Sequence, residues 1–137
     1  MSINANQYKT FNVHEPTPIG LYNQLNEEFN FDFDPYPLHS KVDGLSIEWK
    51  GNVYVSLPYG NILAIRGWLE KGLKEIELGN CKLAVYLLPS YTDVKWFHEI
   101  AIPYASEIRF IKSRLEFGIH KEPIPFASVL LIFKGEV

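Results

Sequence analysis

Cysteine is nearly absent from this sequence, which contains only Cys81. One cysteine excludes an intramolecular disulfide and a cysteine-rich zinc site, and it fits a reducing compartment. The sequence also lacks uncharged apolar runs long enough to cross a membrane, and its N-terminus shows no signal-peptide pattern. We therefore expect a soluble, cytoplasmic protein with no membrane partner. At 137 residues, the chain is long enough to fold as one domain, 1–137, without disulfides.

Several motifs that identify a reaction are absent as well. Neither GxGxxG nor GxxxxGKS/T occurs, which disfavours a phosphate-cradling nucleotide site. The four histidines are scattered without HExxH or HxH spacing, so we expect no metal site. No GxSxG motif surrounds a serine, which argues against a serine hydrolase. The net charge of −3 and a pI near 5.8 argue against a surface that is basic throughout, but they allow local basic patches.

The spacing of apolar residues predicts alternating helices and strands. Residues 1–12 are polar and aperiodic, and we expect them to form a flexible arm. Thr17 and Pro18 suit the N-cap and the first position of a helix reaching Phe29. Further helices are expected over 62–76, with Gly79 as the stop, and over 92–104. Strands are expected over 29–33, 45–49, 53–56, 83–88, 107–112 and 127–133, with 114–117 as a continuation or a hairpin.

This alternation predicts an α/β fold with helices on both faces of the sheet. Residues 83–88 are almost uniformly apolar, as in a strand of a parallel sheet that is covered on both faces. Three expected strands end next to proline, at 34–37, 56–59 and 88–90. Ligands of open α/β sheets bind beyond the carboxyl ends of the strands, so we expect these three ends to form one functional rim.

Seven short motifs follow one another along roughly residues 14–133, and their order is informative. They are EPTP, FDFDPYPL, DGLSIEW, VYVSLPYG, LLPSYTDVKWFHE, EIRFIKSRLEFG and PFASVLLIF. In this order the chain resembles the compact phage-type DNA N6-adenine methyltransferase family. The resemblance implies a Rossmann-like sheet, S-adenosylmethionine as cofactor, DNA as partner, and a phage or viral protein working in the host cytoplasm. Only residues 35–52, 18 in all, separate Asp34 from Val53, so the sheet should be trimmed.

The resemblance assigns five residues to the cofactor: Thr17, Pro18, Asp34, Pro35 and Asp43. Thr17 and Pro18 would open the helix beside it. Asp34 would accept hydrogen bonds from the methionine ammonium or the ribose hydroxyls. Asp43 would meet the adenine amine. The residues alone also allow a plain helix start, an exposed turn aspartate and an Asp-Gly turn at these positions.

Ser56, Leu57, Pro58 and Tyr59 match the catalytic tetrapeptide of the family, which is (Asp/Asn)-Pro-Pro-(Tyr/Phe) in adenine enzymes. Two acceptors aimed at the protons of an exocyclic amine would favour attack of its lone pair on a sulfonium methyl. The aromatic residue would stack on a flipped-out base. Cytosine-N4 enzymes use Ser-Pro-Pro-(Tyr/Phe), so the serine leaves the target base open. Ser56 and Leu57 together also leave open an impaired or inactive enzyme.

By the same resemblance, Arg114 matches a Gly-Arg-x-x-Phe block in which Ser113 replaces the glycine. With Arg109, Lys112 and Lys95 it would form a basic patch for DNA phosphates, although an ordinary solvated strand face explains these residues equally well. No separate recognition domain is visible, so specificity would come from loops or from a second copy in a homodimer. We expect methylation of adenine N6 first and cytosine N4 second. The alternatives are a degenerate member that binds DNA, a protein or the cofactor, and an RNA or protein methyltransferase.

Overall fold

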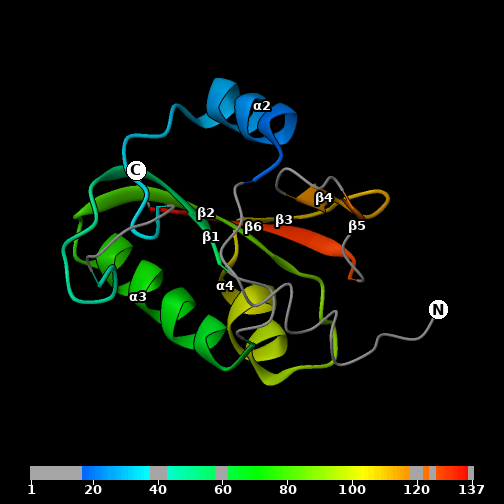
Figure 1. The fold of residues 1–137 in the computed structure, drawn as a ribbon. Coiled ribbons are helices and arrows are strands. Elements are labelled where there is room, and N and C mark those ends of the chain that lie inside the picture. The colour runs from blue at the N-terminus through cyan, green and yellow to red at the C-terminus, as the bar shows by residue number, and fades with distance from the viewer. Residues whose placement is uncertain (1–16, 38–42, 58–61, 118–121, 124–125, 136–137) are drawn as a thin grey trace.

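A four-stranded sheet forms the centre of the protein (Figure 1). The computed structural model describes residues 17–37, 43–57, 62–117, 122–123 and 126–135. In spatial order the strands are β1 (Gly51–Ser56), β2 (Cys81–Pro89), β6 (Ser128–Lys134) and β3 (Glu107–Phe110). Strand β1 is parallel to β2, whereas β6 is antiparallel to both β2 and β3. A separate two-stranded pair consists of β4 (Glu116–Phe117) and β5 (Glu122–Pro123).

Helices cover both faces of this sheet, as the sequence predicted (Figure 1). Helix α2 (Ile19–Phe29) covers one face. The other face carries η1 (Ile62–Ala64), α3 (Ile65–Glu77), the π-helix η2 (Phe97–Ala101) and α4 (Ile102–Tyr104). Alternate residues of β1 serve the two layers, because successive side chains of a strand point to opposite faces. Val53 and Val55 pack on the α3 side, and Tyr54 packs on the α2 side.

The sheet is mixed, which corrects the expectation of a parallel sheet. Strand β2 is buried over Ala84–Pro89, as its apolar run indicated, but only its β1 neighbour is parallel. Strand β6 is buried from Ser128 to Phe133 and runs in the opposite direction. An apolar run records burial on both faces and carries no information about the direction of the neighbouring strand.

Two expected strands are wrong. Residues 29–33 contribute one parallel bridge, between Phe33 and Val53, because Asn30 adopts a left-handed conformation with φ of 51° that ends α2 and turns the chain. Residues 45–49 form no strand. The backbone N–H of Trp49 donates instead to the buried carboxylate of Glu75 on α3, over 3.0 Å, and its indole N–H donates to the Gly44 carbonyl oxygen over 2.8 Å.

The helix predictions are confirmed at α3 and altered at 92–104. Helix α3 is followed by Gly79, whose φ of 80° suits glycine at a helix stop. Over 97–101 the second helix widens into a π-helix. Pro103 lacks a backbone N–H and its ring crowds the carbonyl four residues earlier, which accounts for a wider turn at this point. Trp96, Phe97 and Ile100 are buried.

No helix in the described part of the chain is long and apolar enough to span a membrane. The expected arm over 1–12 lies outside the described residues.

Candidate functional site

Asp34 and Ser56 lie at the same end of the sheet, where its parallel segments have their carboxyl ends. Phe33, the residue before Asp34, forms a parallel bridge with Val53 of β1. Ser56 ends β1 opposite Leu87, close to the end of the parallel strand β2. Since all three segments run in one direction, their carboxyl ends lie together at one end of the sheet. The rim predicted from the sequence is therefore present for Asp34, Ser56 and Pro89.

The phenol of Tyr54 stands at the centre of the predicted site residues. Its Oη lies 2.6 Å from Thr17 Oγ1. Burial raises the pKa of Tyr54, hydrogen bonding with Thr17 and Ser56 offsets part of that rise, and the negative charge of Asp34 adds to it. The Tyr54 hydroxyl therefore interacts with Thr17 and Ser56, and the charge of Asp34 acts on it as well. Sequence reasoning missed Tyr54, although its position two residues before Ser56 places both on the same strand face.

Thr17 does not cap the helix, contrary to expectation. Helix α2 begins at Ile19 with Pro18 in the N-cap position, and no side-chain cap hydrogen bond is formed there. The carbonyl oxygen of Pro18 instead accepts a hydrogen bond from the backbone N–H of Tyr22 over 3.0 Å. The Thr17 hydroxyl hydrogen-bonds with the Tyr54 hydroxyl, because a buried phenol requires a polar partner.

Asp34 is a partly buried carboxylate. Its Oδ1 accepts a hydrogen bond from the backbone N–H of Tyr36 over 2.8 Å, which is an aspartate-turn contact. Within the described part of the chain, Tyr36 is its one hydrogen-bond donor. Burial raises the pKa of Asp34 to about 6, and the Tyr36 hydrogen bond opposes this rise only in part. A carboxylate in this environment gains from a cationic or hydroxyl-bearing partner.

Pro35 and the Asp43 turn lie side by side. Pro35 is buried, and a Cβ atom added to Gly44 would collide with the Pro35 carbonyl oxygen. The Asp43 carboxylate accepts from the backbone N–H of Leu45 over 3.0 Å, so the turn explanation raised from the sequence holds for this residue. The turn nevertheless sits next to the segment that carries Asp34. A role of Asp43 toward the cofactor stays a prediction.

The tetrapeptide is described only in its first half. Ser56 and Leu57 are each 5% exposed, while Pro58 and Tyr59 lie outside the described residues. The Leu57 side chain packs in the α3-side core. This burial restrains a backbone position at which the family carries a proline with a fixed φ.

Arg109 does not belong to a free basic patch, which corrects the expectation. Its guanidinium donates two hydrogen bonds to Glu28 and two to Glu107. Lys95, Lys112 and Arg114 are exposed, with Lys112 and Arg114 in the connection between β3 and β4. Ser113 between them has a φ of 67°, a left-handed conformation that favours glycine. This left-handed conformation explains why the Gly-Arg-x-x-Phe block has glycine at this position.

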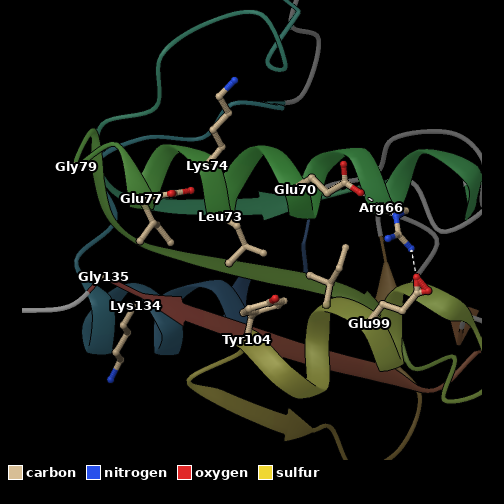
Figure 2. Close-up of a pocket in the computed structure, with 12 residues that line it drawn as sticks. Arg66, Glu70, Leu73, Lys74, Glu77, Gly79, Glu99, Tyr104, Lys134 and Gly135 are labelled. Carbon is tan, nitrogen blue, oxygen red and sulfur yellow. Dashed lines mark hydrogen bonds and ion pairs between the residues drawn. The ribbon is translucent and has the colours of Figure 1, made fainter.

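A groove of about 920 Å³ lies away from this site, between α3 and the helical segment 97–104 (Figure 2). Arg66 and Glu99 are joined across it by an ion pair of 3.1 Å. Leu73 and Tyr104 also line it. It lies on the α3 side of the sheet, whereas Tyr54 packs on the α2 side. No cluster of three metal-ligating side chains occurs among the residues described here.

Comparison with known families places these features in context. The family model described as DNA N-6-adenine-methyltransferase (Dam) matches residues 9–128 of the chain. The chain belongs to the Dam family. The resemblance drawn from the seven motifs is thereby confirmed, and the matched region contains Thr17, Asp34, Asp43, Ser56 and Arg114.

None of the curated proteins matches the sequence significantly. A crystal structure of the 23S rRNA methyltransferase ErmE is similar over 89% of this chain, with 16% sequence identity and a TM-score of 0.41. The Dam-family chain covers 51% of that structure, about half of its length. Nothing about function follows from this similarity.

The described residues fit the cofactor expected for a Dam-family chain. S-adenosylmethionine carries an ammonium group and ribose hydroxyls, and the Asp34 carboxylate has acceptor capacity beyond its Tyr36 hydrogen bond. Its raised pKa indicates a group whose charge is not compensated within the described structure. Thr17 and Pro18 at the start of α2 adjoin the same cluster through Tyr54.

Proposed function

We propose that this chain is an S-adenosylmethionine-dependent DNA methyltransferase acting on an exocyclic amine, adenine N6 in the first place and cytosine N4 in the second. The observation that carries the proposal is the convergence of Asp34 and Ser56 at one sheet edge, around Tyr54, in a chain of the Dam family. The Asp34 carboxylate suits the cofactor, and the Ser56 hydroxyl suits the base.

The residues at this end of the sheet would have different roles in the reaction. The cofactor, when bound, would supply an electrophilic methyl group. Ser56 would accept a hydrogen bond from the target amine, and the Leu57 carbonyl oxygen would accept a second one. Two such acceptors turn the amine so that its lone pair is free to attack, and they stabilise the positive charge that develops on it. The base would be held by Tyr59, and Lys95, Lys112 and Arg114 would contact DNA phosphates.

The test is transfer of a labelled methyl group to single- and double-stranded DNA of mixed sequence, followed by digestion to nucleosides. We expect label in N6-methyladenine. Label in N4-methylcytosine would move the target to cytosine, and label on RNA or protein would reassign the substrate. The Ser56→Ala variant should lose ~100-fold or more in kcat, by analogy with removal of one transition-state hydrogen-bonding group. Tyr22→Phe, on α2, is the control and should keep full activity.

A second candidate is a binding protein that has lost transfer. Ser56 and Leu57, in place of Asp/Asn and Pro, are the observation that favours it. Calorimetry with S-adenosylhomocysteine separates the two candidates when combined with the transfer assay. Binding of the ligand without transfer to any nucleic acid would support the binding protein. Absence of both would reject the enzyme.

A further inference from the structure

The Tyr54 hydroxyl is an unusual polar atom in an apolar layer. Tyr54 is 3% exposed and packs on the α2 side of the sheet with Leu25, Phe29 and Val85. Its ring centroid lies 5.1 Å from that of Phe31 and 5.3 Å from that of Tyr22. A phenylalanine would satisfy this packing without bringing a polar group into it. The hydroxyl therefore has a purpose beyond filling space.

This hydroxyl has two polar neighbours, one on each side of the site. Thr17 Oγ1 at 2.6 Å belongs to the segment that leads into α2. Ser56 lies two residues further along β1, on the same strand face, and its hydroxyl acts on the phenol to lower the pKa of Tyr54. A phenol has one proton to donate and two lone pairs to accept with, so it can serve both neighbours at once. Burial, which raises the pKa of Tyr54, keeps the phenol protonated in the physiological range.

Serine at position 56 creates a requirement that aspartate or asparagine does not. The side-chain oxygen of Asp or Asn carries no proton, so it can only accept from an amine. A serine hydroxyl rotates, and it accepts from the amine only if its own proton is directed elsewhere. The phenol of Tyr54 offers a lone pair for that proton, and the proton of Tyr54 can in turn be donated to Thr17 Oγ1.

We propose, on the basis of the function proposed above, that Tyr54 is a positioning residue which accepts the hydrogen bond of the Ser56 hydroxyl and donates its own to Thr17. This chain of hydrogen bonds leaves the lone pairs of Ser56 directed at the target amine. It also couples the orientation of Ser56 to the segment at Thr17, beside the proposed cofactor. Tyr54 thus compensates for the serine in the tetrapeptide, acting through Ser56 without touching the base.

The test is a cycle of variants of the full chain in the methyl-transfer assay. Tyr54→Phe removes only the hydroxyl and should lower kcat about 10-fold, the value of one hydrogen bond of ordinary strength, with little change in the KM for DNA. In the Ser56→Asn background, which needs no proton acceptor, Tyr54→Phe should change kcat less than about 2-fold. Tyr22→Phe, which removes a hydroxyl from an adjoining ring, should leave kcat unchanged in both backgrounds.

The outcomes separate this inference from the function on which it rests. An equal loss of kcat from Tyr54→Phe in both backgrounds would show a general packing role and would overturn the positioning role alone. Absence of transfer by the wild-type chain and by Ser56→Asn would reject the proposed function, and the positioning role with it. Thermal unfolding of Tyr54→Phe, Ser56→Ala and the double variant gives a readout without activity. Non-additive changes in Tm support the hydrogen bond between the two residues, and additive changes refute it.

Discussion

The Glu28 carboxylate on α2 accepts two hydrogen bonds from the Arg109 guanidinium on β3, over 2.7 and 2.6 Å, although the two residues stand 81 positions apart. Arg109 also lies over the ring of Phe29, 5.4 Å from its centroid. This contact fastens the helix that follows Thr17 to the far edge strand of the sheet. The hydrogen bonds of Arg109 lower the pKa of Glu28, so the carboxylate stays charged at neutral pH.

Glu28→Gln should weaken this attachment only modestly. Both side chains are partly exposed, and an ion pair of that kind contributes up to about 1 kcal/mol to the free energy of unfolding. Urea unfolding at low and at 1 M salt measures it, and the loss should shrink at high salt because ions screen the pair. Glu27→Gln, an exposed neighbour on the same helix, serves as the control. A larger loss that does not respond to salt would rule out an electrostatic origin.

Ser113→Gly should stabilise the protein. Ser113 holds a φ of 67°, which costs an L-residue about 1 kcal/mol relative to glycine. Glycine should therefore raise the free energy of unfolding by about that amount, less its greater entropy in the unfolded chain. Chemical denaturation measures the gain. Ser113→Ala keeps a Cβ atom and should bring no gain, so stabilisation by alanine would count against backbone strain as the cause.

Two glycines of α3 should respond to alanine with opposite signs. Gly67 has open space around an added Cβ, so Gly67→Ala should raise the free energy of unfolding by about 0.5–1 kcal/mol through helix propensity. An added Cβ at Gly72 would collide with Tyr86 Oη, which donates a hydrogen bond to the Trp68 carbonyl oxygen over 2.7 Å. Gly72→Ala should therefore cost about 1–3 kcal/mol through overpacking.

Thermal and urea unfolding of the two alanine variants check this pair. Equal effects at both positions would mean that α3 is not held against Tyr86 as closely as the structure places it.

Binding of S-adenosylhomocysteine should strengthen as pH rises through about 6. Burial raises the pKa of Asp34 to about 6, and only the ionised carboxylate can pair with the ligand ammonium. Calorimetry from pH 5 to 8 should show the Kd fall up to ~10-fold per pH unit below 6 and level off above it. The Asp34→Asn variant should bind weakly with no such dependence. A pH dependence that survives in this variant would place the titrating group elsewhere.

The stability of the ligand-free protein should follow the opposite trend. A carboxyl group whose folded pKa lies above its unfolded value of 3.8 destabilises the folded state as pH rises from about 4 to about 6. Asp34→Asn should therefore raise Tm at pH 7 and leave it nearly unchanged at pH 4. A lower Tm at pH 7 would indicate that the charge is already compensated in the folded protein.

Much of the architecture was predictable from local patterns. The apolar runs at 83–88 and 127–133 became the buried strands β2 and β6, and Gly79 follows α3 as expected. The placement of Asp34 and Ser56 at one end of the sheet was predicted from the alternation of strands and helices, and the segments that carry both residues are parallel in the structure. These features depend on burial and on backbone preference, which each segment expresses in its own composition.

Other features could not be predicted in this way. The expected strand at 45–49 satisfies its backbone through Glu75, a residue of a helix 26 positions later. The sequence grouped Arg109 with other basic residues as a DNA-binding patch. In the structure its guanidinium pairs with Glu28 on helix α2. In both cases the hydrogen-bond partner is distant along the chain, so the local sequence pattern does not reveal it.

The order of residues along this chain was sufficient to establish its α/β class, its buried strands, the edge at which Asp34 and Ser56 lie, and its membership of the Dam family. The packing of distant segments was needed to establish the antiparallel direction of β6, the pairing of Arg109 with Glu28, and the role of Tyr54 as partner of Thr17. The physical reason is that burial and backbone preference belong to single residues and their neighbours. A hydrogen bond between remote polar groups exists only once the core has brought them within about 3 Å of each other.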